Sequence, residues 1–284
     1  MPGWRVLDAD EAAAAVEELA VQASVRLPED VEAALETALR RESRPTARYA
    51  LSMILENARV AASRHMPLCQ DTGMFHLFVE LGEGTALPAG FQEAVDRGLR
   101  RATSRVPLRS SLVDRPLGER RDRGDNTPVS VHVRSGGAAG KIRFTLLAKG
   151  GGSENATRLC MLLPSAGKDG VTRAVMEAVR ARAAHACPPV VVGVGVGADA
   201  AGALTLALQS LLRPLGSRNG RRELAELEEE LLALINGTGI GAAGLGGDVT
   251  ALDVHLEEAP THMACLPVGV VIACHSLRRS SRNL

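Results

Sequence analysis

The stretch PPVVVGVGVGAD at residues 188–199 is typical of a buried strand that ends in glycines. Segments with helical spacing of apolar residues lie on both sides of it, and two strand-like segments follow them. The helical segments are 171–186, 200–213 and 221–236, and the strand-like ones are VTALDVHLEE (249–258) and CLPVGVVIAC (265–274). Because strands and helices are interleaved without a regular repeat, the sequence predicts a mixed α/β (α+β) fold rather than a doubly wound sheet.

The first third of the chain is predicted to be helical. DADEAAAAVEELAVQASV (8–25) and PEDVEAALETALRRE (28–42) repeat apolar residues at helical spacing, and a third helix is expected from Pro45 to about Ser63. We therefore expect one domain over 1–284, with a helical part at about 1–65 packed on a mixed-sheet core at about 66–284. A boundary at 118–125 is an alternative.

The middle of the chain predicts three strands and a helix. Phe75–Leu81 alternates as a strand, 89–106 has helical spacing, and a long polar connection follows. PVSVHVR (128–134) and IRFTLLAKG (142–150) are expected to form two strands around the glycine-rich hairpin SGGAAGK.

Charge and hydropathy limit the partners. The 33 basic and 33 acidic residues cancel, which argues against nucleic acid as the main partner. The N-terminus lacks the pattern of a secretory signal, and the longest apolar stretch, 190–196, is far shorter than the ~20 residues of a membrane helix. We expect a soluble, cytoplasmic protein whose partners are small molecules or other proteins, with no membrane partner.

The five cysteines fall into two groups. Their odd number and wide spacing argue against disulfides and close-paired zinc motifs. Cys160 and Cys265 lie in apolar runs that suit a core, whereas Cys69, Cys187 and Cys274 lie beside loop-forming or polar residues. Thiolates are the preferred ligands of iron–sulfur clusters, so three such loops could meet at one soft metal centre.

Two glycine-rich segments allow a ligand to approach the backbone. GVGVG (193–197) lies at a strand-to-helix transition, but it is not GxGxxG, and no acidic residue ends a second strand ~20 residues later. LLAKGGGSENATR (146–158) places Lys149 and Asn155 beside three glycines. A polar hairpin end is the alternative interpretation of this second segment.

Several motifs together resemble a known family. PLCQDTG, RGDNTPV, KGGGSEN, CPPVVVGVGVG, LLRPLG, INGTGIGAAGLGG, APTHMACLPVGV and CHSLRR occur in this order over roughly 44–279. This set resembles the α-subunit of class I fumarate hydratase and L-tartrate dehydratase. The helix after GVGVG departs from the family pattern, because GADAAGALTLAL replaces the usual Gly-Gly-Thr with its Glu and Lys.

The resemblance implies a four-iron, four-sulfur (4Fe-4S) cluster on Cys69, Cys187 and Cys274. Three thiolates for four irons leave one iron open as a Lewis acid for the substrate hydroxyl. The implied reaction is reversible addition of water to a small dicarboxylic acid, fumarate to malate first and tartrate to oxaloacetate next.

The resemblance also implies roles for individual residues. Gln70 and Asp71 would contact the substrate, with Asp71 assisting proton transfer, and Arg109 would bind a substrate carboxylate. Gly152 and Asn155 match positions that line the same pocket, and His262 matches an active-site histidine.

The family carries further catalytic residues on a second domain or a β-subunit. The resemblance thus implies a β-subunit partner, an α2β2 assembly, and little activity from the isolated chain. Two other hypotheses remain open, a non-catalytic iron–sulfur or scaffold subunit and a nucleotide-binding oxidoreductase that uses GVGVG. The choice among fumarate, tartrate and mesaconate-like substrates is left open as well.

Overall fold

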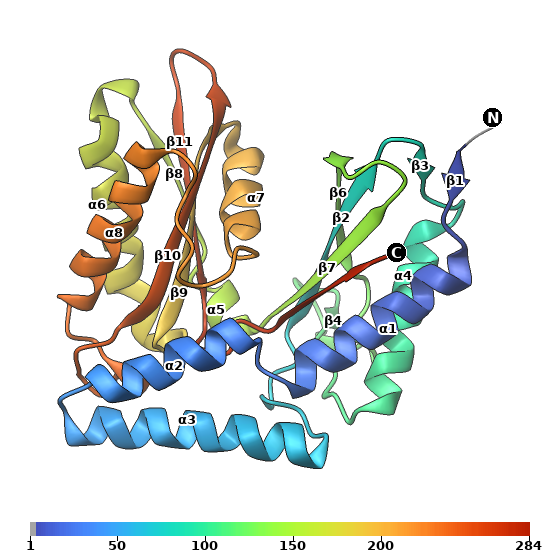
Figure 1. The fold of residues 1–284 in the computed structure, drawn as a ribbon, viewed down its shortest axis with the longest axis horizontal. Coiled ribbons are helices and arrows are strands. Elements are labelled where there is room, and N and C mark those ends of the chain that lie inside the picture. Colours follow the sequence, from blue (N-terminus) through green and yellow to red (C-terminus); the bar gives the residue numbers. More distant parts are fainter. Residues whose placement is uncertain (1–3) are drawn as a thin grey trace. The chain divides into compact units, whose positions relative to one another are not determined.

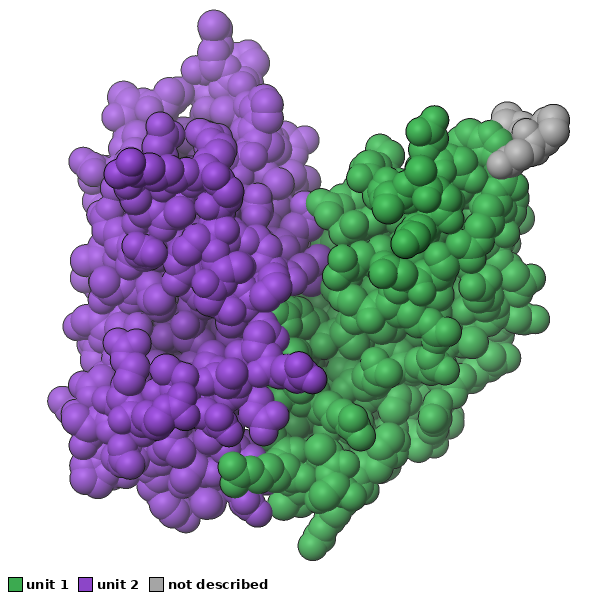
Figure 2. Space-filling view, in the orientation of Figure 1, with its two compact units in different colours: residues 1–28, 57–151, 278–284 green, residues 29–56, 152–277 purple. Residues whose placement is uncertain are grey.

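The computed structural model describes residues 4–284 and has the expected mixed α/β fold (Figure 1). The chain divides into two compact units, which Figure 2 colours separately. Of the described residues, unit 1 comprises 4–28, 57–151 and 278–284, and unit 2 comprises 29–56 and 152–277. The helical part at 1–65 is thus divided between the units, and 118–125 lies inside unit 1.

Unit 1 is a four-stranded sheet with helices on one face. The strand order is β12 (Arg279–Asn283), β7 (Ile142–Lys149), β2 (Met74–Gly82) and β6 (Ser130–Gly137). Helices α1 (Ala9–Val25) and α4 (Phe91–Arg105) pack on the side of the sheet that carries Phe75, Leu77 and Phe144. Short strands β1 (Arg5–Val6) and β3 (Thr85–Ala86) pair in parallel, and β4 (Val113–Asp114) and β5 (Arg121–Asp122) pair antiparallel.

The expected hairpin between β6 and β7 is wrong. Strand β2 lies between them, parallel to β6 and antiparallel to β7. The glycine-rich connection crosses the end of β2, where the Gly82 N–H donates to the carbonyl oxygen of Lys141 at 2.9 Å. A Cβ on Gly82 would lie 1.8 Å from the carbonyl oxygen of Ala138, so the crossing requires a glycine there.

Unit 2 is a three-layer structure. Its strand order is β10 (Ala251–Thr261), β9 (Val190–Ala198), β11 (Leu266–Ala273) and β8 (Arg158–Leu162). Helices α6 (Gly167–Arg182) and α8 (Arg222–Asn236) cover one face, where Val192 and Val194 lie in the core, and α7 (Ala200–Ser210) covers the other (Figure 1). The buried strand expected at 188–199 is confirmed as β9.

The glycines of GVGVG serve the packing of α7. A Cβ on Gly193 would lie 2.1 Å from the carbonyl oxygen of Ala207, and one on Gly195 would lie 2.1 Å from that of Ala203. A Cβ on Gly269 of β11 would also lie 2.5 Å from the Ala203 carbonyl oxygen. The alanine-rich helix therefore lies directly on the sheet backbone, which explains these glycines without a nucleotide.

Two more helices complete unit 2 and its connection to unit 1. Helix α2 (Glu29–Arg41) lies in unit 2, and α3 (Pro45–Arg64) runs from unit 2 into unit 1. The buried carboxylate of Glu42, between them, accepts hydrogen bonds from the backbone N–H groups of Asp248 at 2.8 Å and Val249 at 3.3 Å. This contact fixes the glycine-rich loop INGTGIGAAGLGG, which precedes β10.

The two sheets share one strand plan. In each, an inner strand (β2 or β9) pairs in parallel with an edge strand (β6 or β10) and antiparallel with the other inner strand (β7 or β11). The fourth strand, β12 or β8, is antiparallel to β7 or β11. Because antiparallel neighbours run in opposite directions, the loop before β2 lies beside the end of β7, and the loop before β9 lies beside the end of β11.

The predicted helices agree with the structure to within a few residues. The helices expected at 8–25, 28–42, 45–63 and 89–106 are α1 to α4. Strands β8 and β12 were not predicted, because RLCML is partly apolar without alternation and RSSRN is polar. Among the described residues 4–284, no helix has the length and apolar composition to cross a membrane.

Candidate active site

The CQDTG turn places Asp71 at the start of β2 in unit 1. Gly73 has φ +78°, and a Cβ there would lie 2.3 Å from the carbonyl oxygen of Lys149. The turn can therefore lie against the end of β7 only with a glycine at this position. The Asp71 N–H also points at the Cys69 Sγ, at 3.4 Å, so the thiol and the carboxylate share one turn.

Three donors orient the carboxylate of Asp71. Its Oδ1 accepts from the Gly73 N–H at 3.0 Å and from the Ser111 hydroxyl at 3.4 Å, and its Oδ2 accepts from the Gly151 N–H at 2.7 Å. Ser111 is itself held by Asn126, a fully buried residue whose Oδ1 accepts from the Ser111 N–H at 3.0 Å. The side chain is thus fixed by its own turn, by the loop after α4 and by the glycines after β7.

The other two unit 1 candidates expose their side chains. Gln70 is exposed and, within residues 4–284, makes no hydrogen bond through its amide. Arg109 is also exposed, two residues before Ser111 in the loop that contacts Asp71. Hydrogen bonds from Ser110 and the Gly124 N–H are the main causes that lower the pKa of Asp122, and the positive charge of Arg109 lowers this pKa further. Unit 1 therefore brings the loop of Arg109 to Asp71 and leaves the Gln70 amide available.

Unit 2 brings Cys187 and Cys274 to one end of its sheet. Cys187 is exposed just before β9, with φ +53°, and Cys274 follows β11, the antiparallel neighbour of β9. The Cys187 carbonyl oxygen accepts from the N–H of His275 at 3.3 Å and from its Nδ1 at 3.0 Å. The Cys274 Sγ lies 3.1 Å from the Ser276 hydroxyl. The two cysteine loops are therefore tied together.

The KGGGSEN turn reaches the same end of unit 2. A Cβ on Gly152 would lie 3.1 Å from the carbonyl oxygen of His185, two residues before Cys187. Asn155 is exposed just before β8, whose first residue pairs with Val270 near the end of β11. Gly152 and Asn155 thus lie at the end of the sheet that carries Cys187 and Cys274.

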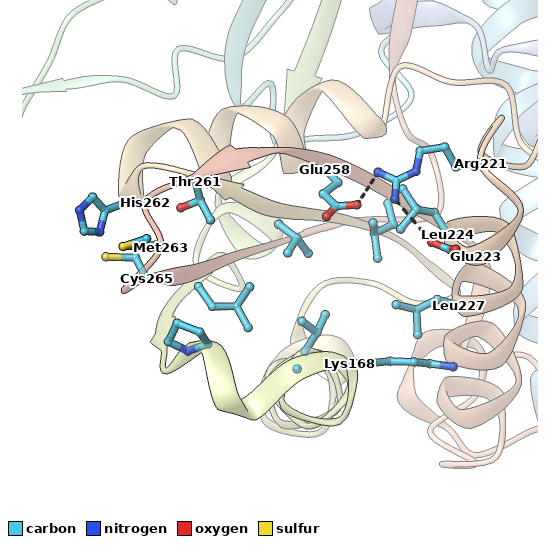
Figure 3. A pocket seen from close by; sticks show the side chains of 16 residues that line it. Lys168, Arg221, Glu223, Leu224, Leu227, Glu258, Thr261, His262, Met263 and Cys265 are labelled. Atoms are coloured by element: carbon cyan, nitrogen blue, oxygen red, sulfur yellow. Dashed lines mark hydrogen bonds and ion pairs between the residues drawn. The ribbon is translucent and has the colours of Figure 1, made fainter.

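His262 lies at the opposite end of the unit 2 sheet. It follows β10, which is parallel to β9, so it lies beyond the far end of β9 from Cys187. The nine residues of β9 span about 30 Å at ~3.3 Å per residue. His262 is exposed and lines a pocket of about 540 Å³, which Arg221 and Glu258, paired at 2.7 Å, also line. Figure 3 shows His262 beside Met263 and Cys265 and away from Arg221 and Glu258. Within one chain, unit 2 does not bring His262 to its two loop cysteines.

The donor chemistry suits an iron–sulfur group. Within residues 4–284 none of the five cysteines forms a disulfide, and Cys69, Cys187 and Cys274 occupy loops at strand ends, as expected. Cys160 packs against the core of unit 2, and Cys265 is half-buried at the pocket. Within each unit, the described residues contain no group of three or more His, Cys, Asp or Glu that could hold a metal ion. The N–H directed at Cys69 is the kind of hydrogen bond that cluster sulfurs accept.

The sequence assigned no individual role to three residues near Asp71. Ser111 carries no motif signal, whereas Asn126 belongs to RGDNTPV and its burial now gives that motif a positioning role. Arg278 of CHSLRR was read only as part of a motif, and it is 2% exposed in the structure.

Comparison with known proteins agrees with the motifs. The family model for fumarate hydratase (Fumerase) matches residues 13–283. A Methanocaldococcus jannaschii protein, provisionally named an L(+)-tartrate dehydratase subunit alpha, is 41% identical over 274 residues, which cover 95% of this chain and 96% of the relative. The L(+)-tartrate dehydratase subunit alpha of Escherichia coli K12 is 31% identical over 276 residues, covering 91% of this chain and 86% of the relative.

The chain belongs to the fumarate hydratase family. Enzymes of this family are lyases that add or remove water, and they are generally iron–sulfur dependent. The chain is therefore a hydro-lyase component.

Proposed function

We propose that the chain is the α-subunit of an iron–sulfur hydro-lyase that reversibly adds water to a small dicarboxylic acid. The observation that carries this proposal is the carboxylate of Asp71, fixed by three donors in the same turn as the thiol of Cys69. A carboxylate beside a cluster ligand is placed to handle a proton where the substrate binds.

Cys69, Cys187 and Cys274 are the proposed ligands of a 4Fe-4S cluster. When bound, such a cluster supplies an iron without a protein ligand, which acts as a Lewis acid toward the substrate hydroxyl. The proposal assigns no further protein ligand to the cluster. The half-buried or exposed state of all three thiols and the tie between the Cys187 and Cys274 loops support it.

Asp71 assists proton transfer in this proposal. Its Oδ2 and Oδ1 accept backbone N–H groups, which fix the carboxylate and spare it a rearrangement during the reaction. The exposed amide of Gln70 and the guanidinium of Arg109 bind the substrate, and the planar fork of Arg109 matches a carboxylate. Gly152 and Asn155 line the same site from the loop before β8.

A β-subunit supplies the remaining catalytic residues, and the proposed assembly is α2β2. The relatives named above are called alpha subunits, which supports a partner of this kind. His262 lies too far from Cys187 and Cys274 within unit 2 to serve them in its own chain. In our proposal His262 contributes to the active site of the second α-subunit, which an α2β2 assembly would provide.

The test is hydro-lyase activity of the anaerobically purified chain with and without a co-expressed β-subunit. We expect fumarate hydration from the pair and little or none from the chain alone. Full activity of the chain alone would contradict the β-subunit requirement. A paired, cluster-loaded protein that is inactive on every dicarboxylate would favour the non-catalytic iron–sulfur or scaffold subunit.

Tartrate is the second candidate substrate. The names of the relatives from Methanocaldococcus jannaschii and Escherichia coli favour it, whereas the name of the family model favours fumarate. The ratio of kcat/KM for L-tartrate dehydration to that for fumarate hydration, measured on one preparation, distinguishes the two. A ratio below one supports fumarate, and a ratio above one makes the protein a tartrate dehydratase.

A further inference from the structure

The side chain of Arg278 is buried, and the described residues offer its guanidinium no hydrogen-bond or ion-pair partner. It is 2% exposed, and its Nε is a buried donor with no acceptor. Across residues 4–284, its guanidinium makes no hydrogen bond or ion pair. Its position is nevertheless fixed, because the Ala148 N–H donates to the Arg278 carbonyl oxygen at 2.9 Å just before β12 begins.

A buried guanidinium with no acceptor is unfavourable for folding. Desolvation penalises an unpaired charge strongly, and buried charges in proteins are normally paired and hydrogen-bonded. Other buried charges in this chain follow that rule. Glu228 binds Arg213 at 2.6 Å, and Asp253 binds Arg218 at 2.8 Å. Among the described residues Arg278 departs from this rule at its Nε, and an acceptor from outside the chain would satisfy it.

Gly150 lies close to the side chains of both Arg278 and Asp71. A Cβ on Gly150 would lie 2.8 Å from the Asp71 Oδ2 and 3.7 Å from the Arg278 Nη2. The two charged groups both lie close to Gly150, yet they form no ion pair with each other. The guanidinium thus remains available beside the carboxylate to which we assign proton transfer. All three residues belong to unit 1.

We propose that Arg278 is a substrate-binding residue that holds a carboxylate of the dicarboxylic acid. This inference rests on the proposed function, because it concerns the same site. A di-acid brings two negative charges, and a buried guanidinium binds a carboxylate more strongly than the exposed Arg109 does, since water competes less. The unsatisfied Nε and the Nη2 offer the adjacent donors of a bidentate contact.

The position of Arg278 also makes it a specificity determinant. Because Arg278 and Asp71 both lie close to Gly150, a carboxylate held by Arg278 brings the carbon that carries it, or its neighbour, near the Asp71 Oδ2. A side chain at position 150 would crowd Asp71. Four-carbon dicarboxylates should therefore bind in one orientation, with the reacting carbons beside Asp71.

The test measures binding, and activity is a second readout. Succinate is a four-carbon dicarboxylate with neither the double bond nor the hydroxyl, so it binds without turnover. Its Kd is measured anaerobically by calorimetry on the cluster-loaded complex of the chain with its β-subunit, for the unaltered protein and for Arg278→Gln and Arg278→Lys. Iron content and the visible spectrum are recorded on each sample.

We expect Arg278→Gln to raise the succinate Kd about 10- to 100-fold, with the iron content and spectrum unchanged. Arg278→Lys keeps the positive charge but loses the two adjacent N–H donors of the guanidinium. Its succinate affinity should therefore lie between those of Arg278→Gln and the unaltered protein. Arg282→Gln is the matched control, because Arg282 lies on β12 and pairs with Glu18 at the surface. Its Kd should equal that of the unaltered complex.

Three outcomes would overturn the inference. An unchanged Kd in Arg278→Gln would show that the residue does not bind the substrate. Loss of iron with an unchanged Kd in the cluster-loaded fraction would make the cluster the partner of Arg278. No succinate binding by an unaltered complex that hydrates fumarate would also contradict the inference and leave the proposed function intact. Arg278-dependent binding by a complex without hydro-lyase activity would support the inference and contradict the function.

Discussion

The carbonyl oxygen of Cys187 accepts two hydrogen bonds from His275, one from the backbone N–H at 3.3 Å and one from Nδ1 at 3.0 Å. The residue before His275 is Cys274, so this contact joins two proposed cluster ligands through their loops. Unit 1 has the same relationship at the equivalent end of its sheet, where the Asp71 Oδ2 accepts from the Gly151 N–H after β7. The shared strand plan therefore brings chemistry-bearing loops together in both units.

Replacing Asp71 by Asn should lower activity without loss of the cluster. The Asn amide cannot accept a proton as a carboxylate does, and its NH₂ group would face either the Gly73 or the Gly151 N–H. We expect kcat to fall at least ~100-fold. Activity assays and iron quantification on the same sample check this. Activity within tenfold of the unaltered enzyme would remove Asp71 from proton transfer.

Two adjacent glycines provide a matched pair of variants. Gly150→Ala places a Cβ 2.8 Å from the Asp71 Oδ2, so the carboxylate must move, whereas the Cβ of Gly151→Ala lies at an ordinary 3.8 Å. We expect Gly150→Ala to lose about 10- to 100-fold in kcat/KM and Gly151→Ala to stay within about twofold. Equal losses in both variants, measured at matched iron content, would contradict the geometry around Asp71.

Gly195→Ala should destabilise the protein through helix α7. Its Cβ would lie 2.1 Å from the Ala203 carbonyl oxygen and 2.6 Å from the Ala207 nitrogen, and both atoms belong to backbone. We expect a loss of about 3 kcal/mol in the free energy of unfolding. Gly220→Ala is the control, because no atom lies within 4 Å of its Cβ, and it should change stability by less than ~0.5 kcal/mol. Urea unfolding compares the two, and an undisturbed Gly195→Ala variant would refute the packing account.

The buried network around Asp253 predicts a pH dependence of stability. Burial alone would raise the pKa of Asp253, but hydrogen bonds from His255 and the Gly216 N–H, with the charge of His255 and a bond from Arg218, lower this pKa from 3.8 to about 2. Because the folded-state pKa is depressed, the stabilisation is present above about pH 4 and is lost as the pH falls toward 2. At ~1.4 kcal/mol per pKa unit this stabilisation amounts to about 2.5 kcal/mol.

Asp253→Asn should therefore be less stable than the unaltered protein at pH 7, and the difference should shrink between pH 4 and pH 2. Urea unfolding at several pH values measures both effects. Glu223→Gln serves as the control, because Glu223 is exposed on α8. If the free energies of unfolding of Asp253→Asn and the unaltered protein differed by a constant amount over the whole pH range, the proposed effect of Asp253 ionisation on stability would be contradicted.

The sequence predicted the elements better than their pairing. Helical spacing located α1 to α4, because that pattern reflects one buried face, and runs of apolar residues located strands such as β2 and β9. The β6–β7 hairpin was wrong because β2, which lies between them, is far from β7 in the sequence. Strand β12 is polar and was missed, since it is held by backbone pairing with β7 rather than by an apolar face.

The candidate site was predicted largely by motifs. Local context separated Cys69, Cys187 and Cys274 from Cys160, which packs against the core of unit 2. It was wrong for Cys265, which lies in the turn between β10 and β11. Distances across the sheet were not predictable from spacing. His262 follows β10 and Cys274 follows β11, only 12 positions on, yet they lie at opposite ends of one sheet. The Ser111–Asn126 support of Asp71 also joins residues whose separation in sequence carries no pattern.

The most direct test of the central claim is an anaerobic measurement of iron and sulfide in the purified chain and in its single Cys→Ser variants. The account predicts about four irons per chain, lost when Cys69, Cys187 or Cys274 is replaced and kept when Cys160 is replaced. No iron after anaerobic reconstitution, with unchanged folding in all four variants, would contradict it.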